Sequence, residues 1–269
     1  MSNISKDLLS AKPFSFSENI NSIFVLGCGG TGSYVVANLS RLLYAMDSPP
    51  TLTLIDGDVV EEKNLLRQHF IEYDLGKNKA SVLAERYSEV FGIEINSIEE
   101  EIKESAHLYR VMSGTGREAT SSIIIGCVDN NASRKMIHEF ANTKLSRKDN
   151  LFWVDCGNEE ASGQVVLGSK ISLTCKNEKT FNMPFVTEIY KEMLSDESQF
   201  NSDLSCAERA ISAPQNMMTN VTAANIAMNC VQSILLHKAI RYHAVEFSID
   251  NSFHKRLNTV ENLESVERK

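Results

Sequence analysis

Short runs of consecutive apolar residues alternate along the chain with longer stretches in which apolar residues recur every three or four positions. The first pattern is typical of buried parallel strands and the second of amphipathic helices. The first pattern predicts strands over 22–27, 51–56, 93–102, 121–129, 151–157, 162–168 and 242–250. The second pattern predicts helices over 31–46, 76–91, 131–145 and 219–240. This alternation predicts an α/β fold with a doubly wound, mainly parallel sheet and right-handed crossovers.

The length of 269 residues fits one such domain covering the whole chain. We expect an arm over 1–20 and a charged tail over 260–269. The segment 169–213 is polar and irregular in pattern, and we expect it to cross the domain as a long loop. Such an excursion is typical of a lid, a partner-binding loop or a disordered stretch.

Composition and charge limit the classes of binding partner and the cellular location that we expect for the protein. The formal net charge is −8 with no basic run, which argues against nucleic acid or an anionic membrane surface as the main partner. The N-terminal residues lack the pattern of a signal peptide, and no run approaches the ~18 apolar residues of a membrane span. These features predict a soluble, cytoplasmic protein.

The six cysteines are widely spaced, because the smallest separation, between Cys156 and Cys175, is nineteen residues. This spacing excludes Cys-x-x-Cys pairs, so we expect no zinc. In a reducing compartment most such cysteines are small buried side chains, and we interpret Cys28, Cys127 and Cys156 in this way.

A glycine-rich turn follows the first predicted strand and opens the first predicted helix. Its sequence, GCGGTG, contains Gly27, Gly29, Gly30 and Gly32 in the GxGxxG pattern. Glycines at this place let backbone N–H groups approach a phosphate at the positive end of a helix. Asp56 ends the next strand, where a carboxylate can bind ribose hydroxyls. These residues fit NAD and ATP equally well.

The residues after the second strand distinguish the two nucleotides. Arg67 and Lys79 supply more positive charge than a dinucleotide pyrophosphate requires, which favours a triphosphate. Asp129 ends another strand at the carboxyl edge of the sheet, where it is a candidate ligand for Mg²⁺. The candidate nucleotide-binding residues are Gly27, Gly29, Gly30, Gly32, Asp56, Asp58, Asn64, Arg67, Gln68, Lys79 and Asn130.

At these residues the chain resembles the ThiF/MoeB/HesA family, the bacterial relatives of ubiquitin-activating enzymes. The motifs GxGGxG, DxDxVxxxNLxRQxF, GxxKA and DN occur in order, and the resemblance extends over 20–168 and, more loosely, 203–240. It implies that Asp56 holds the ribose, that Asn64, Arg67 and Lys79 bind the triphosphate, and that Asp129 binds magnesium. Within the family the chain also resembles the PRTRC type, although this resemblance is weaker than the resemblance to the family as a whole.

The resemblance implies ATP-dependent adenylation of the C-terminus of a partner protein. The implied partner is a small ubiquitin-like or sulfur-carrier protein of the β-grasp fold, ending in Gly-Gly, and the implied assembly is a homodimer. In sulfur-transfer members a cysteine at the place of Cys206 bonds the activated C-terminus. Here Cys206 is either such a nucleophile or an unreactive loop residue, and Cys175 is the weaker candidate.

The sequence departs from the family pattern in two places. It lacks the two Cys-x-x-Cys pairs that bind structural zinc in many members. It also lacks the N-terminal arginine that homodimeric members supply to the neighbouring ATP, since only Lys6 and Lys12 precede the glycine turn. Two alternatives remain: an NAD-dependent oxidoreductase, which leaves Arg67 and Lys79 unexplained, and a non-catalytic scaffold half of a heterodimer.

Overall fold

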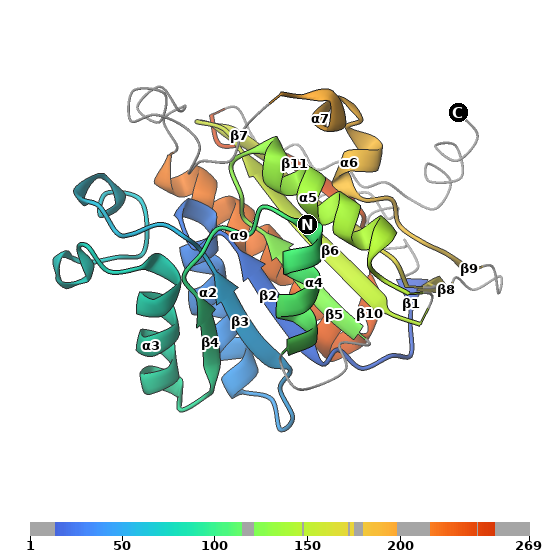
Figure 1. Cartoon of the computed structure of the whole chain (residues 1–269), viewed down its shortest axis with the longest axis horizontal. Helices are drawn as coiled ribbons and strands as arrows, with labels where there is room; N and C mark the ends of the chain where they lie inside the picture. The colour runs from blue at the N-terminus through green and yellow to red at the C-terminus, as the bar shows by residue number, and fades with distance from the viewer. Residues whose placement is uncertain are drawn as a thin grey trace, which may run out of the picture.

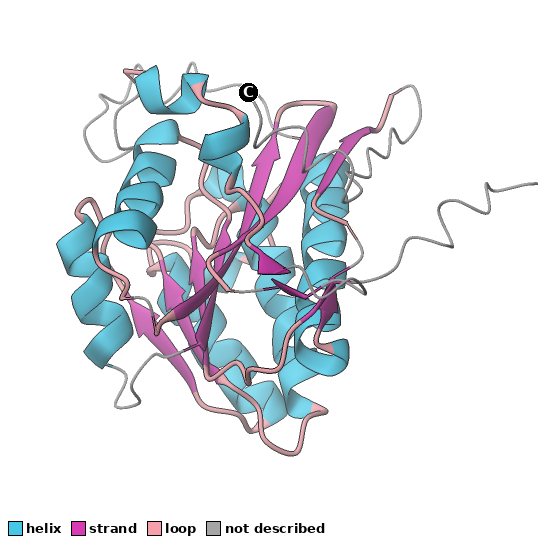
Figure 2. Ribbon diagram, turned by 90° about the vertical axis from the view of Figure 1, so that its right-hand side faces the viewer, coloured by secondary structure: helices cyan, strands magenta, loops and turns pink. Residues whose placement is uncertain are grey.

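A seven-stranded sheet forms the centre of the computed structural model, with helices on both faces (Figures 1 and 2). The structure describes residues 14–114, 121–146, 148–171, 173–174, 180–197, 216–240 and 242–250. The strands of the sheet are β2 (Ser22–Leu26), β3 (Thr51–Ile55), β4 (Ile95–Ile98), β5 (Ser121–Gly126), β6 (Asn150–Asn158), β7 (Ser162–Ser169) and β11 (Ala244–Ser248).

The strand order is β11-β7-β6-β5-β2-β3-β4. The five strands from β4 to β6 are parallel, and β7 pairs antiparallel with both β6 and β11. The doubly wound, mainly parallel α/β fold is therefore confirmed. The chain winds outward from β2 to β4 and then in the other direction from β5 to β6. Ligands of such sheets bind where the winding reverses, beyond the carboxyl ends of β2 and β5.

The helices cover the two faces in separate groups. One face carries α2, α3 and α9, and the other carries α4, α5 and α6. The helical segments are α2 (Gly30–Tyr44), η1 (Glu62–Asn64), η2 (Glu72–Asp74), α3 (Lys79–Phe91), α4 (Ser105–Gly114), α5 (Asn131–Thr143), α6 (Val186–Ile189), α7 (Glu192–Ser195), α9 (Met217–Gln232) and the π-helical η4 (Ser233–His237). No helix in the described ranges is long and apolar enough to cross a membrane.

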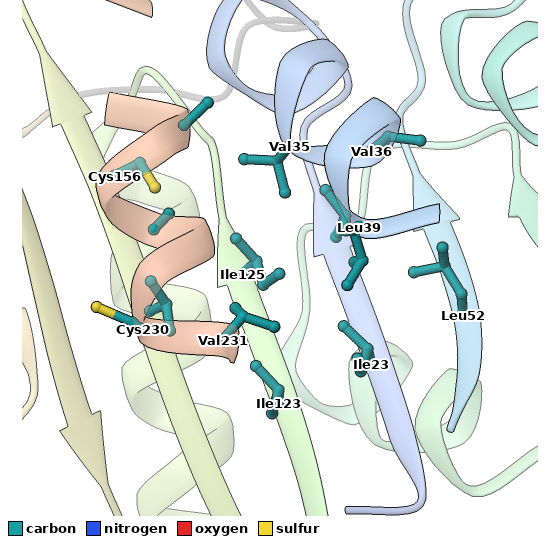
Figure 3. Packing of buried hydrophobic residues seen from close by; sticks show 14 of the residues in the cluster. Ile23, Val35, Val36, Leu39, Leu52, Ile123, Ile125, Cys156, Cys230 and Val231 are labelled. Carbon is teal, nitrogen blue, oxygen red and sulfur yellow. The ribbon is translucent and has the colours of Figure 1, made fainter. Parts of the chain in front are cut away.

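Burial on both faces explains why β2 is a continuous apolar run. Ile23 and Val25 belong to the core under α2 and α9, whereas Phe24 and Leu26 belong to the core under α4 and α5. Figure 3 shows Ile23 facing Leu39 of α2. Because alternate side chains of a strand point to opposite faces, both halves of the run must be apolar.

A second, smaller sheet joins segments that are far apart in the sequence. Its order is β10-β1-β8-β9, and Phe14 of β1 is the register partner of Ile240 in β10. Phe16, just after β1, packs its ring 4.9 Å from the ring of Phe152. The four strands are β1 (Phe14–Ser15), β8 (Leu173–Thr174), β9 (Thr180–Phe181) and β10 (Ala239–Ile240).

The described part of segment 169–213 differs from the irregular loop that the sequence predicts. It contains β8, β9, α6 and α7, and Met183, Phe185 and Val186 are buried. Phe185 lies so close to Gly168 that a Cβ atom on this glycine would meet the ring at 2.4 Å. The Nε2–H of His243 donates to the carbonyl oxygen of Pro184 at 2.8 Å. These residues are therefore part of the core and not of a detached lid.

Other elements differ from prediction at their ends. The sequence pattern predicts no helix where α4 lies, and the strand predicted over 93–102 is limited to β4. The helix predicted over 219–240 ends as an α-helix at Gln232, continues as η4 and gives way to β10 after Lys238, which has a positive φ of 45°.

The α2 core permits a direct test of the packing. Leu39 has no exposed surface, so Leu39→Ala leaves a cavity and should lower the free energy of unfolding by about 3 kcal/mol. The control is Val90→Ala, since Val90 is 64% exposed and this change should alter stability by less than about 0.5 kcal/mol. Urea denaturation measures both variants, and equal losses would contradict the assigned core.

Candidate functional site

The glycine turn between β2 and α2 has no room for side chains at two positions. Gly27 has a φ of +88°, and a Cβ atom on Gly32 would lie 1.9 Å from the carbonyl oxygen of Gly27. The first turn of α2 contains no acidic residue, and its N-cap, Gly29, makes no side-chain capping bond. No side chain of α2 itself therefore neutralises the positive end of the helix, which suits an anion.

A cleft of about 410 Å³ opens beside this turn, at the carboxyl ends of β2, β3 and β5. Its volume lies in the range of small-molecule sites. Gly30 and Gly32 shape the turn without lining the cleft. The predicted residues that line it are Gly27, Gly29, Asp56, Asp58, Asn64, Arg67, Gln68, Lys79, Asp129 and Asn130.

Asp56 connects the end of β3 to the glycine turn. Its Oδ2 accepts a hydrogen bond from the backbone N–H of Cys28 at 2.6 Å, and its Oδ1 accepts one from Asp58 at 2.8 Å. Burial raises the pKa of Asp56, while the Lys79 charge and these two donors act in the opposite direction. Because both oxygens are held by backbone groups, the carboxylate has one orientation at the rim of the cleft.

Lys79 brings a positive charge into the cleft from the first turn of α3. Its Nζ lies 2.8 Å from Oδ2 of Asp58, and only 8% of its side chain is exposed. Burial alone would lower the pKa of Lys79, but the charges of Asp56, Asp58 and Asp129 outweigh it, so this pKa is raised. The ammonium group therefore stays protonated at neutral pH.

The segment around η1 supplies the second predicted cation, Arg67, and two amides, and Lys63 of the same segment also lines the cleft. Burial lowers the pKa of the Arg67 guanidinium, and Asp129 partly offsets this shift. The side-chain oxygen of Asn64 accepts from the backbone N–H of Glu61 at 2.9 Å, so it also fixes the turn. The buried Oε1 of Gln68 has no hydrogen-bond partner among the described residues. A buried acceptor of this kind suits a donor on a ligand, such as a ribose hydroxyl.

Asp129 lies at the junction of β5 and α5, next to Asn130. Asn130 caps α5, since its Oδ1 accepts from the N–H of Ser133 at 2.8 Å. Within the described ranges, no group of three His, Cys, Asp or Glu side chains forms a ready metal site. A magnesium ion at Asp129 would therefore need phosphate and water oxygens as its other ligands, which is the usual arrangement for Mg²⁺.

A buried ion pair behind Asp129 is absent from the sequence predictions. Nε of Arg134 lies 3.1 and 3.0 Å from the two carboxylate oxygens of Asp155, and its Nη2 donates to the carbonyl of Val128 at 3.0 Å. Burial raises the pKa of Asp155, and Arg134 lowers it. Two signals could have identified the pair: an arginine one turn from the buried Ile137, and an aspartate within an apolar strand.

A second cleft of about 370 Å³ adjoins the first one toward β7 and β11. The two clefts share Val128, Asp129 and Asn158. Asn158 donates through its Nδ2 to Asn220 of α9, and the hydroxyl of Thr31 lies 3.4 Å from the same Asn220 oxygen. This polar network links the start of α2 to the boundary between the clefts, and the sequence patterns do not indicate it.

The two candidate nucleophiles, Cys206 and Cys175, lie outside the described residues, as do Lys6 and Lys12. The structure thus brings together the predicted nucleotide-binding residues and leaves the predicted transfer cysteine without a described position.

Comparison with known proteins gives one family and several structures. The ThiF family model matches residues 18–265. PaaA aligns with a TM-score of 0.60 and 19% identity over 89% of this chain and 73% of its own. E. coli MccB with ATP aligns with a TM-score of 0.56 and 19% identity over 89% of this chain and 64% of its own.

A further MccB structure, with AMPCPP and MccA, has a TM-score of 0.57 and 20% identity, over 89% of this chain and 64% of MccB. This chain thus spans less than two thirds of MccB. No curated protein sequence matches the chain. The structural likenesses at this identity establish a shared fold.

The Arg134–Asp155 pair can be tested by removing one charge and then both. Arg134→Met leaves a buried carboxylate without its partner and should lower the free energy of unfolding by about 3–5 kcal/mol at pH 7. The deficit should shrink in acid, because the raised pKa of Asp155 lets the folded variant take up a proton before the unfolded chain does.

The double variant Arg134→Met/Asp155→Leu is the control, and it should regain most of the lost stability. Denaturant titrations at pH 7 and pH 5 measure all three proteins. A single variant as stable as the wild type would show that the pair contributes nothing.

Proposed function

Since this chain belongs to the ThiF family, we propose that it uses ATP to adenylate the C-terminal carboxylate of a small protein. The observation that carries the proposal is the convergence of Arg67 and Lys79 on the glycine turn within one cleft. A buried lysine and a half-buried arginine at this place exceed what a dinucleotide requires and match the charge of a triphosphate.

Each cleft residue has a proposed task in the reaction. Asp56 accepts hydrogen bonds from the ribose, and the turn at Gly29 receives phosphate oxygens. Asn64, Arg67 and Lys79 bind the β- and γ-phosphates. A carboxylate oxygen of the substrate attacks the α-phosphorus in line with the leaving pyrophosphate, so an acyl-adenylate forms. The residues act by positioning the reactants and by offsetting negative charge, and no side chain is needed as a nucleophile.

Asp129 is the proposed magnesium ligand. When bound, the ion would neutralise charge on the phosphates. The pairing of Arg134 with Asp155 and with the carbonyl of Val128 holds the backbone next to Asp129, which supports a role for this carboxylate at the boundary of the two clefts.

The second cleft is the proposed route for the substrate tail. It reaches Asp129 and Asn158 from the side of β7 and β11, and Gly157 and Gly163 form part of its wall. We propose a ubiquitin-like or sulfur-carrier protein of the β-grasp fold as the substrate, because a flexible Gly-Gly tail can extend through such a passage. MccB, which shares the fold, is crystallised with MccA.

The proposed assembly is a cytoplasmic homodimer. The connection between β3 and α3 exposes Leu66, Ile71 and Tyr73, which are 84%, 59% and 79% exposed. A second copy of the chain would cover these side chains. A scaffold role without catalysis is disfavoured, because such a role does not require the charged set in the cleft.

Two measurements test the proposal: the binding of ATP compared with NAD, and the rate of ATP–pyrophosphate exchange. The protein should bind ATP–Mg²⁺ in calorimetry and bind NAD poorly. With candidate β-grasp proteins it should catalyse ATP–pyrophosphate exchange, and Lys79→Met should reduce the rate roughly hundredfold because it removes a charge from the transition state. Lys77→Met is the matched control, since Lys77 is exposed and lies over the ring of Tyr73. Tight NAD binding without ATP binding would exclude adenylation.

Transfer to a thiol is a separate step that a second variant isolates. Cys206→Ser should leave exchange nearly intact, because the acyl-adenylate forms without a cysteine, while any reducible adduct with the carrier disappears. Gel mobility with and without reductant measures the adduct. Cys230→Ser, at a buried helix position, serves as the comparison. If adduct and exchange both survive in Cys206→Ser, Cys206 is not the acceptor.

A further inference from the structure

Two cysteines lie side by side beneath the glycine turn, a feature that adenylation does not use. Gly126 of β5 and Asp155 of β6 are register partners in parallel strands. The next residues along the two strands are Cys127 and Cys156. The pair Gly126–Asp155 is the last one of the β5–β6 ladder, and the backbone N–H of Cys127 donates on the other side of β5 to the carbonyl of Leu26 in β2 at 2.8 Å.

The two side chains point to the same face of the sheet. Residues two apart in a strand share a face, and Ile125 and Val154 both belong to the core under α2 and α9. Cys156 lies in that core and Cys127 packs against it, and Figure 3 shows the Cys156 sulfur beside α9. The two side chains are near enough for Cys127 to raise the pKa of the Cys156 thiol.

The spacing of the strands fits a covalent link. Neighbouring strands lie about 4.8 Å apart, and disulfide-bonded cysteines have Cα atoms about 4.4–6.8 Å apart. Both thiols are free in the structure. A bond between them would require their Cβ atoms to lie about 3.5–4.5 Å apart.

The two thiols differ in access. Cys127 lines the cleft, whereas Cys156 is 1% exposed. The neighbouring Cys127 and burial raise the pKa of Cys156, so this thiol is a poor target for an oxidant on its own. An oxidant entering the cleft therefore reaches Cys127 first, with Cys156 beside it.

We propose that Cys127 and Cys156 form an oxidative modification site, at which a peroxide closes a disulfide across β5 and β6. In the first step hydrogen peroxide oxidises the Cys127 thiol to a sulfenic acid, its O–O bond breaks, and water leaves. In the second step the Cys156 sulfur displaces the hydroxyl, the S–S bond forms, and a second water leaves with the Cys156 proton. A dithiol reductant reverses the reaction.

The link would change the cleft because Cys127 is packed tightly against its surroundings. A Cβ atom on Gly27 would meet the Cys127 carbonyl oxygen at 2.6 Å, and one on Gly32 would meet Cys127 Cβ at 3.3 Å. Val128 and Asp129 follow directly. Drawing Cys127 toward β6 shifts these residues, and a displacement of about 1 Å can reduce a reaction rate roughly hundredfold.

Peptide mapping of the full chain tests the site without nucleotide, so its result is independent of the adenylation proposal. After treatment with hydrogen peroxide, the peptides containing Cys127 and Cys156 should be recovered as one species lighter by two hydrogens, and dithiothreitol should separate them. Bonding of Cys127 to any other cysteine, or accumulation of its sulfenic acid without a bond, would overturn the proposal.

The second measurement is the rate of ATP–pyrophosphate exchange, and this test rests on the proposed function. Peroxide should reduce ATP–pyrophosphate exchange of the wild type about a hundredfold and reversibly. Cys156→Ala should keep its basal exchange and lose the reversible inhibition. The matched control Cys230→Ala, another buried thiol in the same core, should be inhibited like the wild type. If peroxide closes the mapped bond and exchange is unchanged, the bond forms but does not control the cleft, and that part of the proposal is wrong.

Discussion

The contact between Gly32 and Gly27 constrains the rest of the site. With a Cβ atom only 1.9 Å from the Gly27 carbonyl oxygen, the chain can close this turn only where position 32 has no side chain. Closure brings the N-terminus of α2 against the end of β2 and places the N–H of Cys28 on the Asp56 carboxylate. The positive helix end and the negative carboxylate thus share one rim. Most other cleft residues are positioned relative to this turn, because they come from β3 or β5, the two strands that pair with β2, or from the segments that follow these strands.

Two acid–base pairs flank the point at which the winding of the sheet reverses, and they differ in character. Lys79 and Asp58 form an open pair at the end of β3, in which Asp58 is half exposed, so the ammonium group can exchange this partner for a phosphate. Arg134 and Asp155 form a closed pair at the end of β6, in which both side chains are buried and all contacts are internal. The first pair is suited to binding and the second to holding the chain around Asp129 in place. A site that must release product needs both kinds.

Local patterns predict the strands of the large sheet, most helices and the charged residues at the strand ends, because each follows from a short run or from the end of a strand. Asp56 and Asp129 are predictable for this reason, although their roles remain predictions. The Arg134–Asp155 pair and the contact of Thr31 with Asn220 are not predictable in this way. They join residues 21 and 189 positions apart, and they exist only after helices dock on the sheet. The prediction of an irregular loop over segment 180–197 fails for a related reason. Its few apolar residues, such as Phe185, lie among polar ones in the sequence. The Phe185 ring is buried because Gly168, on the facing strand, has no side chain in its place.

The small sheet has a consequence for how the chain is made. Its first strand, Phe14–Ser15, pairs with Ala239–Ile240, and β7 obtains its outer partner only from Ala244–Ser248. During synthesis on a ribosome, the parallel strands from β2 to β6 can assemble while these late residues are still inside the exit tunnel. The strand at Phe14 and the outer edge of β7 must wait until residues 239–248 have left the tunnel, since pairings over such long separations form late. Until then the nascent protein presents an open strand edge, and a chaperone would have its greatest effect at that stage.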